Sequence, residues 1–140
     1  MSNKTLSEKY LQWLTDNIQE RKLDNGFIEL SFPFLDNDND HIQLYAKKIS
    51  DGKYLLSDDY YLSGQMYDDQ KERAQRLIRA TALQYQISVA DDMELRSVCD
   101  EETLPQSIQS FVECLISTNR FLSILRSMQF ITAGGDLCGN

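Results

Sequence analysis

A run of alternating acids, LDNDNDH, is the stretch of the sequence with the clearest chemical potential. It places Asp36, Asp38 and Asp40 at every second position, directly before His41, the one histidine of the chain. Carboxylates this close repel one another and favour a bound cation, and these three match positions 1, 3 and 5 of an EF-hand calcium loop. That loop requires glycine at its sixth position and a bidentate glutamate at its twelfth, where this chain has His41 and Lys47. The run therefore does not fit an EF-hand, and only a weak divalent-cation site is compatible with it.

The same run also fits a solvated hairpin turn. Asn and Asp favour turns because their side chains bond to their own backbone, and a loop of about five residues is an ordinary length. In the strand expected after it, alternation separates an apolar face from a polar face that carries His41, Gln43 and Tyr45. Together with Asp40 these residues form a strip of good hydrogen-bonding groups. We expect a turn followed by a strip that is either solvated or used in recognition.

Other common site chemistries lack their residues. Cys99, Cys114 and Cys138 are widely spaced without a CxxC pair, so a zinc site would need a distant cysteine to converge on His41. The sequence contains no GxSxG, GxxxxGK[ST] or GxGxxG motif, which removes the familiar signatures of a serine hydrolase and of phosphate-binding loops. Cys114 falls in an apolar helical pattern and is expected to serve packing. We therefore expect no catalytic residues, no bound metal and no cofactor.

Size and charge narrow the class of partner. The chain has 140 residues and a net charge of -8, which repels nucleic-acid backbones and anionic lipids but suits a basic protein surface. The start shows no signal-peptide pattern, and no apolar run reaches the ~18 residues of a membrane span. Three unpaired cysteines favour a reducing compartment. A cytoplasmic protein without a membrane segment is expected.

The hydrophobic pattern predicts a single α+β domain over residues 1–132 and a flexible, glycine-rich tail over residues 133–140. An N-terminal helix is expected to precede a three-stranded antiparallel meander, and a second helix to precede a short β pair and a C-terminal helix. The predicted helices cover residues 3–21, 68–85 and 104–130. The predicted strands cover residues 27–34, 41–49, 53–59, 86–89 and 93–98, with an Asn-Gly turn within 23–27.

The order of these elements resembles the core of the PD-(D/E)xK nuclease superfamily, in which two acids hold magnesium and a lysine assists the attacking water. Asp40 takes the place of the first acid. The third strand contains no acid-x-lysine tripeptide, because Lys53 begins it, Asp58 and Asp59 end it, and Lys47 belongs to the strand before. The resemblance implies an alternative function, a metal-dependent nuclease-like enzyme or its inactive descendant.

A second resemblance is more local. The segment PFLDNDNDHIQLYAKK, followed by YLLSDD, resembles a small-domain family of bacterial and phage proteins catalogued as domain of unknown function eighteen twenty-eight. The likeness covers residues 32–59 well, and the second helix and the short β pair agree in layout. It implies a bacterial or phage origin, and the residues that match its pattern are Asp40, His41, Gln43, Tyr45, Asp58 and Asp59. Where the pattern has glycine next, this chain has Tyr60, so we expect the loop to bend differently here.

These observations favour a small acidic binding protein that inhibits or regulates another protein by contact. Phage anti-CRISPR proteins have similar size and charge, and by analogy the acidic surface would occupy a basic nucleic-acid channel of a host enzyme without binding nucleic acid directly. Clustering of acids on one face is the feature that would separate this function from the nuclease alternative. The last helix is apolar on more than one side, so a homodimer stays open. The candidate binding surface consists of Asp36, Asp38, Asp40, His41, Gln43, Tyr45, Asp58, Asp59 and Tyr60.

Overall fold

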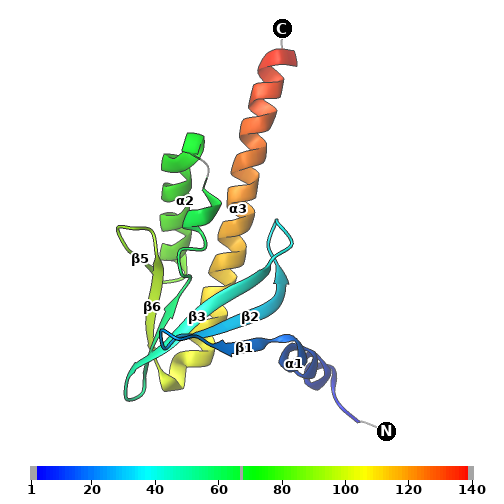
Figure 1. The fold of residues 1–140 in the computed structure, drawn as a ribbon. Helices are drawn as coiled ribbons and strands as arrows, with labels where there is room; N and C mark the ends of the chain where they lie inside the picture. Colours follow the sequence, from blue (N-terminus) through cyan, green and yellow to red (C-terminus); the bar gives the residue numbers. More distant parts are fainter. Residues whose placement is uncertain (1–2, 67, 139–140) are drawn as a thin grey trace.

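Three helices and a six-stranded antiparallel sheet form the part of the chain that the computed structural model describes, residues 3–66 and 68–138 (Figure 1). The α+β prediction is therefore confirmed. The elements follow one another as α1 (Leu6–Asn17), β1 (Gln19–Lys22), β2 (Ile28–Leu35), β3 (His41–Ser50), β4 (Lys53–Ser57), α2 (Lys71–Gln84), β5 (Ser88–Val89), β6 (Leu95–Asp100) and α3 (Leu104–Cys138).

The sheet has the strand order β1-β2-β3-β4-β6-β5 and every neighbouring pair is antiparallel. Strands β2, β3 and β4 form the predicted meander, and β6 adds to β4 after the chain has passed through α2. Helix α3 packs against β3, β4 and β6, and α2 packs against α3, so both helices lie on one face (Figure 1). In the part of the chain that the structure describes, neither α2 nor α3 covers the opposite face of the sheet.

The core lies between this face and the two helices. Strand alternation turns Ile42 and Leu44 of β3 inward, where both are fully buried, and leaves the residues between them on the outer face. The predicted helix stripes supply the other side, through Ile78 of α2 and through Phe111 and Leu115 of α3. Cys114 is also fully buried, in agreement with a packing role. The inward and outward residues of β3 thus have separate functions, the first in packing and the second at the surface.

Strand β1 was not predicted, because the first helix, whose apolar face ends at Ile18, was extended to Arg21. The helix ends at Asn17 instead, and Ile18 takes an extended conformation. The following residues pair with β2, with Gln19 opposite Ser31 and Lys22 opposite Ile28. This pairing is a tertiary interaction that overrides local helix propensity. The Asn-Gly turn, in which Gly26 has a φ of +90°, could have indicated strand β1, because such turns join the two strands of a hairpin.

The N-terminal helix contributes little to the core. Helix α1 buries none of its residues, and its apolar Leu6 is 84% exposed. Helix α3 continues well beyond the sheet (Figure 1). Residues 133–138 of the expected flexible tail belong to this helix, while residues 139–140 lie outside the described residues, so the flexibility of the tail stays a prediction. Within the described residues, no helix has both the length and the apolar character that crossing a membrane requires.

Replacing Leu44 by alanine should lower the free energy of unfolding by about 2–5 kcal/mol, since the fully buried side chain would leave a cavity in the core. Leu83→Ala is the matched control, because this α2 leucine is 77% exposed and its loss should cost less than about 0.5 kcal/mol. Urea unfolding of the two variants measures the difference. Equal losses would contradict the assignment of the core to this face of β3.

Candidate functional site

A pocket lies beside β3 because this strand extends further than its neighbour. Strand β4 ends at Ser57, which pairs with Tyr45, whereas β3 begins four residues earlier at His41. The beginning of β3 therefore has β2 on one side and no strand on the other. The chain leaves β4 there and turns into the segment 58–65. The space between this segment and the first half of β3 is a hollow of about 520 Å³.

This hollow, the β3–β4 pocket, brings together most of the predicted surface residues. Six of them line it, namely Asp40, His41, Gln43, Tyr45, Asp58 and Asp59. The same pocket is lined by Tyr61 and Gln65, which sequence reasoning did not select. Asp36, Asp38 and Tyr60 are not among its lining residues. The sequence feature that could have pointed to Tyr61 and Gln65 as pocket residues was their position shortly after the Asp58–Asp59 pair.

Asp36 closes the turn between β2 and β3. Its Oδ1 accepts the backbone N–H groups of Asp38 (2.8 Å) and Asp40 (2.9 Å), and its own N–H donates to the Asp40 carbonyl. The turn prediction for the aspartate run is thus confirmed, with a loop of residues 36–40 between the strands. Burial alone would raise the pKa of Asp36, but hydrogen bonds from Tyr61, Asp40 and Asp38 outweigh it and hold the pKa below its ordinary value.

Tyr61 connects this turn to α3. Its hydroxyl donates to Oδ2 of Asp36 at 2.6 Å and accepts from Nδ2 of Asn119 at 2.9 Å. Asn119 also bonds Asn37 twice, through its side-chain oxygen and its backbone carbonyl. Burial and the neighbouring Asp36 carboxylate raise the pKa of Tyr61, so the phenol stays protonated. Tyr61, which forms part of the pocket wall, is therefore held by hydrogen bonds to the β2–β3 turn on one side and to α3 on the other.

The side chains along β3 are positioned by a second set of hydrogen bonds. His41 Nδ1 lies 2.7 Å from the Phe32 carbonyl, which can only accept, so Nδ1 carries the proton and Nε2 is the nitrogen left for other contacts. Gln43 donates to the Ser31 hydroxyl at 3.0 Å. Tyr45 donates to Glu29 at 3.2 Å, and burial together with that carboxylate raises the pKa of Tyr45 to about 12. The polar strip predicted from alternation is therefore an ordered row.

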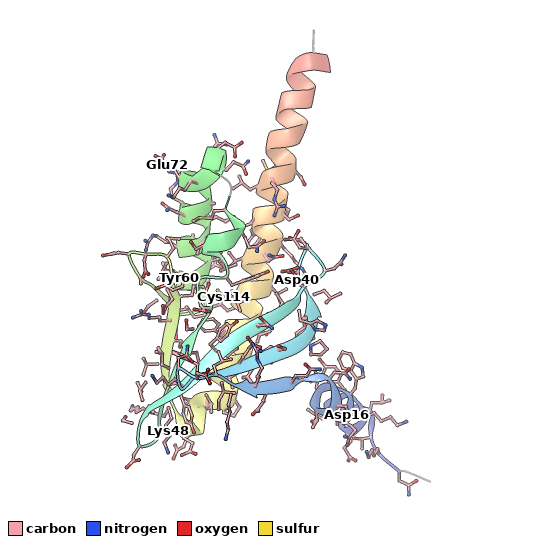
Figure 2. All side chains as sticks on the ribbon, viewed as in Figure 1. Asp16, Asp40, Lys48, Tyr60, Glu72 and Cys114 are labelled. Carbon is pink, nitrogen blue, oxygen red and sulfur yellow. The ribbon has the colours of Figure 1, made fainter. Side chains whose placement is uncertain are left out.

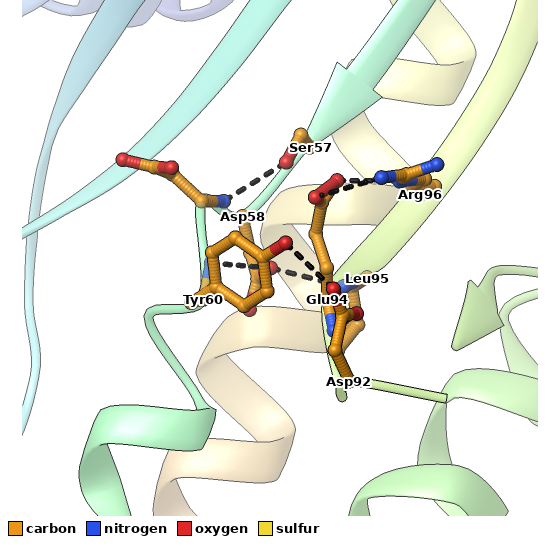
Figure 3. A network of polar contacts seen from close by, with 8 residues as sticks. Ser57, Asp58, Tyr60, Asp92, Glu94, Leu95 and Arg96 are labelled. Carbon is orange, nitrogen blue, oxygen red and sulfur yellow. Dashed lines mark hydrogen bonds and ion pairs between the residues drawn. The ribbon is translucent and has the colours of Figure 1, made fainter. Parts of the chain in front are cut away.

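Asp58 is the most buried residue of the pocket, and its carboxylate stabilises the fold by accepting backbone hydrogen bonds. Its Oδ1 accepts the backbone N–H groups of Leu95 (3.0 Å) and Tyr60 (3.1 Å), and its Oδ2 accepts that of Leu62 (3.2 Å). Figure 3 shows how these contacts connect the end of β4 with the beginning of β6. Burial raises the pKa of Asp58 above its ordinary value even though the three N–H groups act in the other direction.

The loop after Asp58 bends as glycine would allow, although it contains none there. Asp59 and Tyr60 have φ angles of +48° and +65°, in the left-handed region that costs a non-glycine residue roughly 1 kcal/mol or more. Tyr60 adopts the left-handed conformation itself, and the expectation that this loop bends differently from that of its relatives stays a prediction. Its hydroxyl donates to Asp92 at 2.7 Å, an interaction also drawn in Figure 3. This contact helps to hold the strained loop.

Negative charge dominates the outer face around the pocket. Three of the eight lining residues are aspartates, and neither lysine nor arginine lines the pocket in the described part of the chain. A smaller hollow of about 90 Å³ adjoins it, sharing Tyr45 and Asp59 and adding Glu94. The nearby cations are already paired, Arg21 with Glu29 at 3.2 Å and Arg96 with Glu94 at 2.5 Å. The pocket lining itself is suited to a positively charged ligand.

The lysines considered for a nuclease site lie elsewhere. Figure 2 shows Asp40 and Lys48 toward opposite ends of β3, and the neighbouring Lys47 lies about 20 Å along the strand from Asp40. Lys47 donates to the Asn25 carbonyl at 3.4 Å and lies over the Phe27 ring. Lys53 pairs with Asp100 at the far end of β4 from Asp58. The pocket thus combines acids without the lysine that the nuclease-like chemistry needs.

Among the side chains that the structure describes, no group of three or more histidine, cysteine, aspartate or glutamate residues is arranged to hold a metal ion. The geometry explains this for the acids of the pocket. Both oxygens of Asp58 are engaged by backbone N–H groups, and the Asp36 carboxylate is occupied by the turn and by Tyr61. The carboxylates of Asp40 and Asp59 are left to face a ligand.

Asp58→Ala should lower the free energy of unfolding by about 2–4 kcal/mol, because it leaves backbone N–H groups without their acceptor where the strands β4 and β6 meet. Asp40→Ala, in the same pocket but exposed, should change it by less than about 0.5 kcal/mol. Chemical denaturation of both variants makes the comparison. A loss at Asp40 as large as that at Asp58 would show that the two acids have the same structural role.

Asp36→Asn should lower stability by about 1–2 kcal/mol near pH 7, and this difference from the parent should shrink as the pH falls toward about 3. The folded chain holds the pKa of Asp36 below its ordinary value of 3.8, so the unfolded chain takes up the proton first. Stability from this group is therefore present above that value and lost on acidification. Urea unfolding at both pH values tests this, with the exposed Asp38→Asn as control. A pH-independent difference would contradict the assignment.

Comparison with known proteins adds a family match. Residues 32–117 match a family model described as "Domain of unknown function DUF1828". The match spans the chain from β2 to the first part of α3 and includes every residue that lines the β3–β4 pocket. No curated protein and no solved structure matches the chain.

Proposed function

The chain belongs to the family of the domain of unknown function DUF1828, and because that description assigns no reaction we propose a function from the pocket itself. The protein is a non-enzymatic binding protein that inhibits or regulates another protein, and it receives a basic part of that partner at the β3–β4 pocket.

One observation carries this proposal, the composition of the pocket wall. Asp40, Asp58 and Asp59 are brought to one hollow from two separate segments, and no lysine or arginine joins them among the described residues. The net charge of -8 adds a long-range field of the same sign. Such a field speeds the approach of a basic partner and repels nucleic acid. Recognition of a positively charged protein surface is the function that both features favour.

The contacts within the pocket argue for binding over the nuclease-like alternative. In that chemistry two acids hold the metal and a lysine assists the attacking water, but Asp58 has its oxygens engaged by the backbone. Lys47 and Lys53 have partners elsewhere. What is left at the surface is a row of oriented acceptors, which can hold a ligand, and no lysine lines the pocket among the described residues.

The narrower form of the proposal concerns the class of partner. A protein that binds nucleic acid presents a basic channel, and a rigid acidic surface can occupy such a channel. An inhibitor of this kind, of phage or prophage origin and acting in the cytoplasm as anti-CRISPR proteins do, is the specific function we propose for the chain. The analogy of size and charge supports this narrower form.

The test uses a double variant in which two aspartates are replaced by the uncharged and nearly isosteric asparagine. Asp40→Asn with Asp59→Asn removes two charges from the pocket, and asparagine tolerates the left-handed φ of residue 59. The control, Asp51→Asn with Glu102→Gln, removes two charges from exposed positions that do not line the pocket. Tagged parent, pocket variant and control are used to capture partners from lysate of the native cells, with identification by mass spectrometry.

A basic protein captured by the parent and by the control, but reduced about tenfold or more with the pocket variant, is the expected result. Equal capture by all three chains would mean that the pocket is not the contact surface. Failure of the parent to retain any stoichiometric partner would count against the binding function as a whole. Circular dichroism of each variant verifies that the fold is kept.

A further inference from the structure

We infer that the β3–β4 pocket takes an arginine side chain of the partner, with the guanidinium bound by the carboxylates of Asp40 and Asp59 against the rings of Tyr45 and Tyr61. This inference rests on the proposed function and specifies its ligand. It follows from the shape of the pocket and from the hydrogen-bonding capacity that its side chains have left.

The pocket is a shaped cavity and more than a group of acids. Five of its eight lining residues are histidine, glutamine or tyrosine, and its volume of about 520 Å³ exceeds that of a single side chain. It can therefore admit a long side chain together with the backbone that carries it. Ligand sites commonly combine a few oriented polar groups with ring surfaces in this way.

Most donor groups of the wall are already used inside the protein. The hydroxyls of Tyr45 and Tyr61 donate to Glu29 and Asp36, and His41 donates its Nδ1 proton to the Phe32 carbonyl. Gln43 uses one amide N–H on Ser31. Among the described residues, the amide of Gln65 and the second N–H of Gln43 are the donors of the wall left for a ligand.

The acceptors, in contrast, are largely left over. The carboxylates of Asp40 and Asp59 accept no side-chain hydrogen bond from the described residues, and the contact of His41 with the Phe32 carbonyl leaves its Nε2 unused. A ligand that complements this wall must supply several donors and a positive charge. An anion such as phosphate has the wrong sign and the wrong hydrogen-bonding character.

The tyrosine rings distinguish between the two common cationic side chains. Guanidinium is planar, carries five N–H donors in a fixed fork, is weakly hydrated and stacks on aromatic faces. Lysine offers a compact, strongly hydrated charge with three donors. Because each phenol donates to a carboxylate behind it, both rings stay neutral and their orientation is held. Flat ring surfaces beside carboxylates match the guanidinium plane better than an ammonium group.

A divalent cation is a poorer match. It needs several oxygen ligands converging on one point. The described side chains show no such grouping, and two of the wall's five non-acidic residues are tyrosines whose neutral hydroxyls are weak ligands. The extended row of acceptors along β3 fits a branched donor group instead.

The experiment titrates the full-length, ¹⁵N-labelled protein with two short peptides, N-acetyl-Gly-Arg-Gly-amide and N-acetyl-Gly-Lys-Gly-amide. Chemical-shift changes are followed at the Gln43 and Gln65 side-chain amides and at the His41 backbone. The arginine peptide should bind with a dissociation constant about threefold or more below that of the lysine peptide. Asp40→Asn with Asp59→Asn should weaken it about tenfold, and Asp51→Asn with Glu102→Gln should leave it unchanged.

A second pair of variants tests the ring. Tyr45→Phe keeps the aromatic face, so the preference for arginine should remain, whereas Tyr45→Leu should reduce that preference to about equal binding of the two peptides. Well-dispersed spectra of both variants exclude unfolding as the cause. If both variants lost the preference for the arginine peptide, or if both kept it, the Tyr45 ring would not be the group that selects arginine.

The outcomes separate this inference from the proposed function. Equal binding of the two peptides by the parent would overturn the arginine assignment while leaving an acidic binding pocket. If magnesium or calcium alone caused saturable shifts and displaced the peptide, the ligand of the pocket would be a divalent metal ion and not an arginine side chain. No pocket shift with either peptide would also overturn the inference. If capture of the cellular partner then still depended on Asp40 and Asp59, the proposed function would stand, and otherwise both would fail.

Discussion

A buried carboxylate at the end of β4 is the constraint on which both the fold and the pocket depend. Asp58 is fully buried and accepts N–H groups from the start of β6 and from its own loop. Its carboxylate adds a side-chain anchor to the backbone pairing between the end of β4 and strand β6, which arrives only after α2. The same contacts fix the reversal that carries Asp59 and Tyr61 to the pocket. One side chain thus joins a distant strand to the sheet and shapes the neighbouring surface.

The pocket exists because β3 and β4, the two strands of one hairpin, differ in length. β3 extends past β4, and the exposed half of the longer strand is bordered by a loop that Asp58 and Tyr61 hold from two directions. The order of the wall is therefore built in before any ligand arrives. A preordered surface loses less conformational entropy on binding than a mobile one, which is consistent with the binding function that we propose.

Much of this architecture could be predicted from the sequence where the pattern is local. Alternation along residues 41–46 separated packing from surface side chains correctly, and the aspartate run was recognised as a turn because aspartate bonds its own backbone. Strand β1 was missed because its pairing with β2 is a tertiary contact. Tyr61 and Asn119 are 58 residues apart, and nothing in the local pattern of either residue indicates their hydrogen bond. Left-handed Tyr60 was also not foreseeable, since the strain is balanced by contacts from elsewhere in the fold.

The two outermost strands have a consequence for the behaviour of the protein in concentrated solution. β5 has only two residues, and β1 consists of Gln19, Glu20, Arg21 and Lys22, all exposed. Open strand edges are templates on which other chains can add, and shortness and charge are two ways in which natural sheets prevent this. Each edge of this sheet uses one of them. These two features disfavour edge-to-edge aggregation of the sheet, so the chain is expected to stay dispersed at high concentration.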